Sequence, residues 1–220
     1  MRTSPPTASR TATTPSTAAS CAYGAAVLFA AHLATYFIPA IRDVTVTSSV
    51  VGAVLLAVLA VTQHLVVFPI VGALPAPRFA RLAGYTWLVV DMGTDLLQLG
   101  GAPKSLYLVL RLGINLVAAL WLASASLRAH GGMRPLGVLV AADLACYSFV
   151  ALLSPLAFVV ALPSLILLPL WFVLAGRCLA LTGRASDRAA HVTADTNTDT
   201  SARERADRVA FVSGSSTNAG

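Results

Sequence analysis

Six long blocks of apolar residues, separated by short polar turns, run through most of this sequence. They lie near residues 22–41, 48–74, 82–100, 104–127, 135–153 and 155–178. An α-helix needs about 20 mostly apolar residues to cross the roughly 30 Å of hydrocarbon in a bilayer, and most of the blocks reach that length. The sequence therefore predicts an all-α, polytopic integral membrane protein, built as a bundle of six transmembrane helices.

The composition excludes a soluble fold, and the pattern excludes a membrane barrel. Charged residues make up 11% of the chain and hydrophobic residues 57%, whereas a soluble domain has about 25% charged residues. A transmembrane barrel would show strands of about 10 residues that alternate between apolar and polar. The runs at 50–61 and 157–171 are instead continuously apolar. Helices satisfy their backbone groups internally and remain as the spanning element.

The positive charges gather on one side of the predicted bundle. If six spans alternate, twelve of the fifteen Lys and Arg residues fall in the termini and in the loops 75–81 and 128–134. The other side has only Arg42 and Lys104, and Arg111 lies inside a helix. Because cytoplasmic loops are enriched in Lys and Arg, we expect a plasma-membrane protein with both termini in the cytoplasm. The net charge of +6 does not indicate a nucleic-acid partner, because it forms no patch on a folded surface.

The two ends of the chain differ in composition from the apolar blocks. Residues 1–20 are rich in Ser, Thr, Pro and Ala, and residues 182–220 are similar in kind. Such segments bury too little apolar surface to fold alone, so we expect disordered tails around a transmembrane domain at 21–181. The three cysteines are an odd number, and none lies in a predicted outer loop. We therefore expect no disulfide.

Charged residues interrupt the third and fourth apolar blocks. Asp91 and Asp95 are four residues apart and share one face of a helix. Arg111 and Asn115 have the same spacing in the next helix. Counted from the turn near Ala102, Arg111 lies between the two carboxylates in depth. A charged side chain in lipid costs roughly 2.5–3.5 kcal/mol, so we expect these residues to face one another inside the bundle.

Residue counts along the other helices add further ionisable groups to this level. They place His32 and Asp143 near the bilayer midplane with Asp91, and His64 deeper toward the cytoplasm. Asp143 has no obvious cationic partner. Because burial favours the neutral form of an acid, Asp143 is the sequence's best candidate for proton chemistry. An interior histidine is more often satisfied by a neighbour than used as a ligand or relay.

No motif in the sequence names a reaction. The Gly-x-Ser-x-Gly pattern of a nucleophilic serine is absent. A haem between His32 and His64 is disfavoured, because their expected levels differ by about 10 Å. A metal site built from His32, Asp91 and Asp95 would compete with Arg111 for the same carboxylates. We therefore expect no cofactor and lean against an enzyme.

Two functions remain open at this stage. The first is a small proton-coupled transporter or carrier, with the bilayer and a small molecule or ion as partners, and with a sixth helix kinked at its prolines as a gate. The second is a non-catalytic sensor or assembly component in which the buried charges only specify helix packing. Substrate and oligomeric state stay open. Both hypotheses rest on the polar layer, formed by His32, Asp91, Asp95, Arg111, Asn115 and Asp143.

Overall fold

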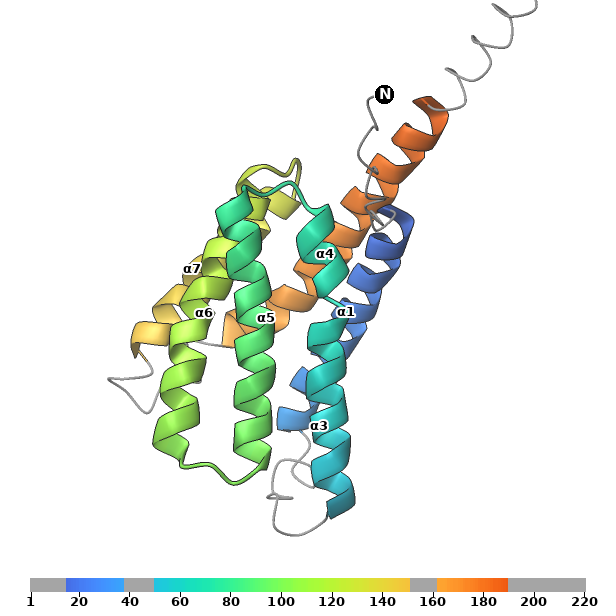
Figure 1. The fold of residues 1–220 in the computed structure, drawn as a ribbon. Coiled ribbons are helices and arrows are strands. Elements are labelled where there is room, and N and C mark those ends of the chain that lie inside the picture. Colours follow the sequence, from blue (N-terminus) through green and yellow to red (C-terminus); the bar gives the residue numbers. More distant parts are fainter. Residues whose placement is uncertain (1–14, 38–49, 151–161, 190–220) are drawn as a thin grey trace, which may run out of the picture. The chain divides into compact units, whose positions relative to one another are not determined.

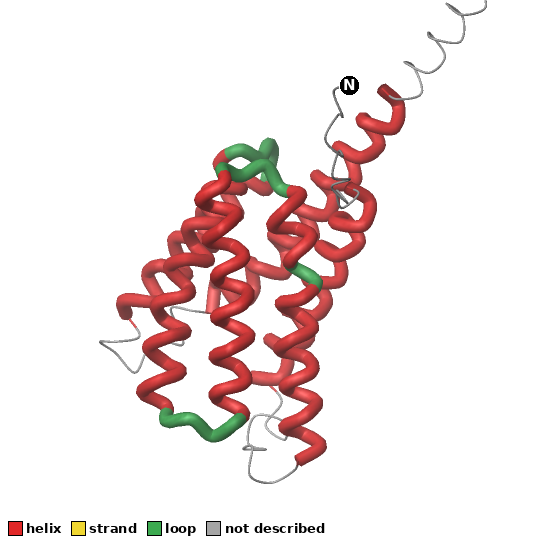
Figure 2. The backbone as a smooth tube through the Cα atoms, viewed as in Figure 1, coloured by secondary structure: helices red, strands yellow, loops and turns green. Residues whose placement is uncertain are grey.

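A computed structural model describes residues 15–37, 50–150 and 162–189, and its described regular elements are all α-helices (Figure 1 and Figure 2). The helices are α1 (Pro15–Phe37), α3 (Val50–Leu65), α4 (Phe68–Ala73), α5 (Arg78–Leu99), α6 (Lys104–Leu127), α7 (Met133–Val150) and a C-terminal helix, Leu162–Ala189. The chain divides into two compact units, Met1–Ala180 and Leu181–Gly220. The bundle and the site described below belong to the first unit.

Five described stretches are long and apolar enough to cross a membrane. They are Ser16–Thr35, Val54–Ala73, Ser105–Leu127, Met133–Val150 and Leu162–Ala189. The prediction of an all-helical fold is therefore confirmed for the described residues, and the five apolar helices are consistent with a membrane bundle. The predicted count of six spans is not confirmed. The missing span is α5, whose 22 residues would extend over about 33 Å. Its length suffices, but its two arginines and two aspartates make it the most polar of the long helices.

The second predicted span, 48–74, is not one continuous helix. α3 and α4 are separated by two residues, and Pro69 lies in the first turn of α4. Proline has no N–H to donate to the carbonyl of Leu65, so the regular ladder cannot continue there. Instead, the Val67 N–H donates to the His64 carbonyl at 3.0 Å, one residue closer than in an α-helix. The break therefore falls at Val66 and Val67, between the end of α3 at Leu65 and the start of α4.

Both terminal helices extend beyond the predicted transmembrane domain of 21–181. α1 already begins at Pro15, a residue whose fixed φ suits a first helical position. Ala18 and Ala19 are buried, so the packed face of α1 includes part of the tail expected at 1–20. The C-terminal helix continues through 182–189, where we expected disorder. The remainder of both predicted tails lies outside the described residues.

Two prolines of the sixth predicted span lie in a described helix. The first part of that span, up to residue 161, lies outside the described residues. Pro163 is the second residue of the described helix. The helix continues through Pro169 without unwinding.

Small residues bring the helices of the first unit close together. Ala18, Ala22 and Ala25 form a fully buried stripe on α1. On α7, a Cβ atom added at Gly137 would overlap the side chain of Ser126 on α6. Membrane helices associate through such small-residue contacts, because lipid gives no hydrophobic drive between them. Large apolar side chains remain exposed on the outer faces of all the long helices, including Val27, Val58, Leu82, Val109, Leu139 and Ile166.

Six aromatic side chains form a closed circuit of ring contacts that we call the aromatic cluster. In order around the circuit, they are Phe29, His64, Trp87, Trp121, Trp171 and Phe172, with neighbouring ring centroids 5.2–6.3 Å apart. Stacked and edge-to-face ring pairs stabilise a fold beyond the burial of their apolar surface, and they favour particular ring orientations. The cluster joins five helices and contains all three tryptophans of the chain. Of these residues, His64 also contacts Asp91 of the polar layer.

Candidate functional site

The hairpin of α5 and α6 positions the charged residues. The helices run antiparallel and are joined by residues 100–103 (Figure 1). Gly101 in this turn has φ +78°, a conformation that glycine adopts without strain. Because the turn is short, the polar stripe of α5 faces the polar stripe of α6 at matched depth.

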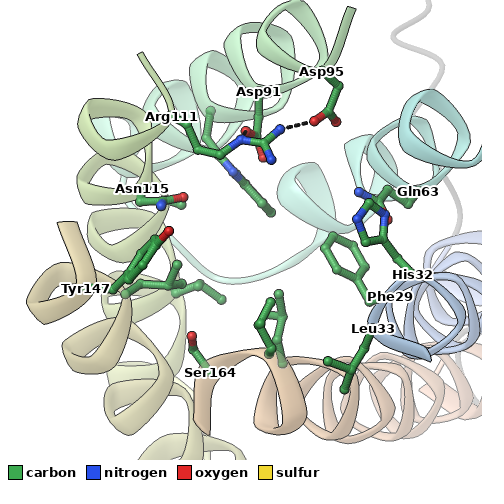
Figure 3. A pocket seen from close by; sticks show the side chains of 16 residues that line it. Phe29, His32, Leu33, Gln63, Asp91, Asp95, Arg111, Asn115, Tyr147 and Ser164 are labelled. Atoms are coloured by element: carbon green, nitrogen blue, oxygen red, sulfur yellow. Dashed lines mark hydrogen bonds and ion pairs between the residues drawn. The ribbon is translucent and has the colours of Figure 1, made fainter. Parts of the chain in front are cut away.

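Arg111 of α6 contacts both carboxylates of α5. Its Nη2 atom donates a hydrogen bond to Asp95 Oδ1 (Figure 3). Its Nε atom lies 3.6 Å from Asp91 Oδ1, close enough for an ion pair but too long for a hydrogen bond. Asp95 is only 7% exposed, so its negative charge depends on this partner. The structure thus brings together the three charges that the sequence placed on facing stripes.

His64 is part of the same charge group, which corrects the depth that we expected for it. Its Nε2 atom lies 3.0 Å from Asp91 Oδ2, so the two residues are at one level. His64 is fourteen residues from the start of α3 at Val50, whereas Asp91 is eight from the end of α5 at Leu99. Measured from the level of the His64–Asp91 contact, the start of α3 is therefore about 9 Å farther away than the end of α5. Counting from the turns failed because it treated the helix ends as level.

The hydrogen bonds of His64 define how many protons the pair with Asp91 holds. Nδ1 lies 2.6 Å from the carbonyl oxygen of Ala60. A carbonyl only accepts, so Nδ1 carries a hydrogen. The bond between Nε2 and Asp91 needs one more proton, either on an imidazolium or on a neutral carboxyl group, because an ionised carboxylate also only accepts. The His64–Asp91 pair has no net charge in either form.

A cavity of about 250 Å³ lies beside these charges within the first unit (Figure 3). It is smaller than the roughly 300–1,000 Å³ of pockets for drug-sized ligands, so it suits a small solute or a few waters. The walls combine charged, polar and aromatic side chains. The lining residues are Phe29, His32, Leu33, Gln63, Trp87, Asp91, Asp95, Arg111, Asn115, Ala118, Leu122, Leu144, Tyr147, Ser164, Leu165 and Leu168.

Five polar side chains without a permanent charge complete the cavity wall, and one of them is Ser164 of the C-terminal helix. His32 and Gln63 lie next to each other, across the cavity from Asn115 and Tyr147 (Figure 3). His32 and Asn115 were expected in the polar layer, and both line the cavity. Gln63 was missed. The signal for it was the polar triplet that Gln63 shares with Thr62 and His64, in an otherwise apolar helix.

Asp143 lies apart from the other acids. It is not among the residues that line the cavity. Its Oδ2 atom accepts a hydrogen bond from the backbone N–H of Ser164, at 2.8 Å, in the first turn of the described C-terminal helix. A backbone N–H stabilises a carboxylate through a charge-assisted hydrogen bond, so Asp143 has a partner that a search for cations could not find. Tyr147, one turn farther along α7, does line the cavity.

No group of three or more His, Cys, Asp and Glu side chains is arranged for a metal ion within the described ranges. The carboxylates that could serve as ligands are directed at Arg111 and His64 instead. The site thus combines two carboxylates, an arginine and a histidine beside a cavity.

Comparison of the chain with models of known protein families, with characterised proteins and with solved structures finds no match. The functional argument that follows rests on the geometry of the site and on the physical chemistry of the bilayer.

Proposed function

We propose that the protein is a small proton-coupled carrier of the plasma membrane. In this proposal the cavity binds the solute, and the His64–Asp91 pair binds and releases the proton. The observation that carries the proposal is the contact of His64 Nε2 with Asp91 Oδ2 at 3.0 Å, since Asp91 lines a cavity in a bundle of apolar helices. Ionisable groups inside membrane bundles commonly mark proton or substrate pathways.

The carrier requires α5 to cross the membrane as a sixth span. Its length of 22 residues is sufficient. Its acids do not face lipid, because Asp95 is buried against Arg111 and Asp91 is paired with His64. Its outer face carries exposed apolar residues such as Leu82 and Val89. An even number of spans puts both termini on one side, and the excess of Lys and Arg assigns that side to the cytoplasm.

Cysteine labelling tests this topology at the two ends of α5. Single cysteines are introduced as Phe79→Cys and Ala102→Cys, in a background without Cys21, Cys146 and Cys178. In intact cells, a membrane-impermeant thiol reagent should label Ala102→Cys and not Phe79→Cys. Labelling of both positions would show that α5 does not cross, and labelling of Phe79→Cys alone would reverse the orientation.

Charge balance explains why solute binding would be coupled to the proton. Arg111 and Asp95 cancel each other, and the protonated His64–Asp91 pair adds no net charge. Loss of the proton leaves one negative charge at the cavity, which changes its affinity for a charged or polar solute. By linkage, a solute that prefers one protonation state must shift the proton equilibrium by the same free energy.

Proton flux in vesicles tests the carrier directly. The purified protein is reconstituted into vesicles that contain a pH-sensitive dye, and a panel of small solutes is added outside. At least one solute should change the internal pH faster than in empty vesicles. His64→Gln keeps a hydrogen-bonding side chain but has no group that titrates, so it should remove this response. The matched control is His130→Gln, at an exposed residue of the α6–α7 loop, which should retain it.

The packing hypothesis remains the second candidate, and the direct contact of Arg111 with Asp95 favours it. This ion pair and the aromatic cluster would hold the helices in place without any transport. A packing role predicts no solute-dependent proton flux in the parent protein. It also predicts that His64→Gln changes only the thermal stability. That combination of results would reject the carrier.

A further inference from the structure

Two buried oxygen atoms of residues in the cavity wall accept no hydrogen bond from any described residue. They are Oδ2 of Asp95 and Oε1 of Gln63. Both residues are more than nine-tenths buried. The nearest cationic candidate for Asp95 Oδ2 is His64 Nδ1, but at 3.8 Å it is too far for a hydrogen bond and donates to Ala60 instead. Buried acceptors are nearly always paired in folded proteins, so this wall suits a ligand that donates hydrogen bonds.

The charges around the cavity favour a cationic ligand. The titratable or charged groups that line the cavity are His32 on α1, Asp91 and Asp95 on α5, Arg111 on α6 and Tyr147 on α7. His64 on α3 is not a lining residue but contacts Asp91. The lining residues of the C-terminal helix add none, since they are serine and leucine. With His32 and Tyr147 neutral, the site has no net charge when the His64–Asp91 pair is protonated and a charge of minus one when it is not. An anion is disfavoured in both states.

The size and the apolar part of the wall narrow the ligand further. A volume of about 250 Å³ accepts a small organic ion but excludes a lipid. Phe29 and Trp87 are among the residues that line the cavity. Aromatic rings attract organic cations through their faces. A desolvated inorganic ion would gain less from these rings.

We infer that the cavity binds a small monovalent organic cation with N–H groups, of the ammonium or guanidinium class, in exchange for the proton of the His64–Asp91 pair. Asp95 Oδ2 and Gln63 Oε1 accept hydrogen bonds from the cation. One proton leaves as one positive charge enters, so the site is neutral in both loaded states. This inference rests on the proposed carrier function, for which it names the substrate class and a one-for-one exchange.

Guanidinium and tetramethylammonium form the test pair. Both carry one positive charge, but only guanidinium has N–H donors. The full-length protein in detergent is titrated with each ion at low millimolar concentration in weak buffer that contains a pH indicator. Guanidinium should bind and release about one proton per site. Tetramethylammonium should bind at least about tenfold more weakly.

Variants of Gln63 test the acceptor without touching the charges. Gln63→Leu removes the amide oxygen and should lower the affinity for guanidinium by about tenfold or more. Gln63→Asn keeps an amide oxygen without adding a charge and should restore part of the binding. The matched control is Gln98→Leu on the exposed face of α5, which should leave the affinity unchanged. Thermal stability is measured for each variant, so that a loss of binding is read only from folded protein.

The outcomes separate this inference from the carrier function. Equal binding of the two ions, binding without proton release, or no effect of Gln63→Leu would each overturn the inference. Proton flux with other solutes but not with guanidinium would overturn it and leave the carrier intact. Guanidinium binding with proton release, but without flux in vesicles, would support the inference and reject transport.

Discussion

The polar layer has two halves. Each half contains one aspartate of α5, and the two aspartates have different partners. Asp95 pairs with Arg111 and joins α5 to α6, whereas Asp91, one helical turn away, pairs with His64 and joins α5 to α3. An arginine stays charged at any physiological pH, so its pair with Asp95 holds a fixed charge distribution. The contact of His64 with Asp91 instead needs a proton that either partner can carry. The comparison teaches that two acids one turn apart on one helix can have partners of different kinds, a fixed charge for Asp95 and an imidazole for Asp91.

The first prediction breaks the fixed half of the layer and should have the largest effect. Arg111→Leu leaves the buried carboxylate of Asp95 without its cation. Removing one member of a buried pair costs about 3–5 kcal/mol, so the thermal unfolding temperature in detergent should fall sharply. The double variant Arg111→Leu with Asp95→Asn should recover much of the loss, because no unpaired charge remains. Unchanged stability of Arg111→Leu would show that the contact between α5 and α6 is wrong.

The second prediction compares the same substitution in the two halves. Asp95→Asn removes the negative charge from the partner of Arg111 and should cost about 2 kcal/mol, less than a fully buried pair because the arginine is partly exposed. Asp91→Asn copies the shape of the protonated acid and can still hydrogen-bond to His64, so it should cost about 1 kcal/mol or less. The measurement is thermal unfolding of both variants in one detergent. The reverse order would mean that Asp91 is the fixed charge.

The third prediction concerns the acid outside both halves. Asp143→Asn keeps an oxygen that can accept the Ser164 N–H, so it should change stability by less than about 1 kcal/mol. Asp143→Ala removes the acceptor and should cost about 1 kcal/mol, as the loss of other helix caps does. Chemical denaturation or thermal unfolding distinguishes the two variants. Equal loss in both would show that the hydrogen bond to Ser164 contributes little.

The helices and the facing stripes were predictable because they depend on local patterns. Apolar blocks of sufficient length indicate spans, and spacing of four residues puts Asp91 and Asp95 on one face. A short turn brings α5 and α6 to matched depth, so the position of Arg111 followed from counting. These inferences need no knowledge of how distant helices are offset.

The partners of Asp91 and Asp143 were not predictable for two physical reasons. The pairing of Asp91 with His64 depends on where α3 begins relative to the end of α5, and no local pattern encodes that offset. The partner of Asp143 is a backbone amide, which every residue other than proline has, so it leaves no mark in the sequence. Consequently, the sequence assigned the proton to Asp143, whereas the geometry supports the His64–Asp91 pair.

Proton flux through Asp91→Asn and Asp143→Asn, measured side by side in dye-loaded vesicles, tests the central claim most directly. Both variants replace one acid by its amide, and both are first shown to be folded by thermal unfolding. The account predicts that solute-dependent proton flux is lost in Asp91→Asn and retained in Asp143→Asn. Flux that persists in Asp91→Asn and disappears in Asp143→Asn would contradict the account and would identify Asp143 on α7 as the residue that binds the proton.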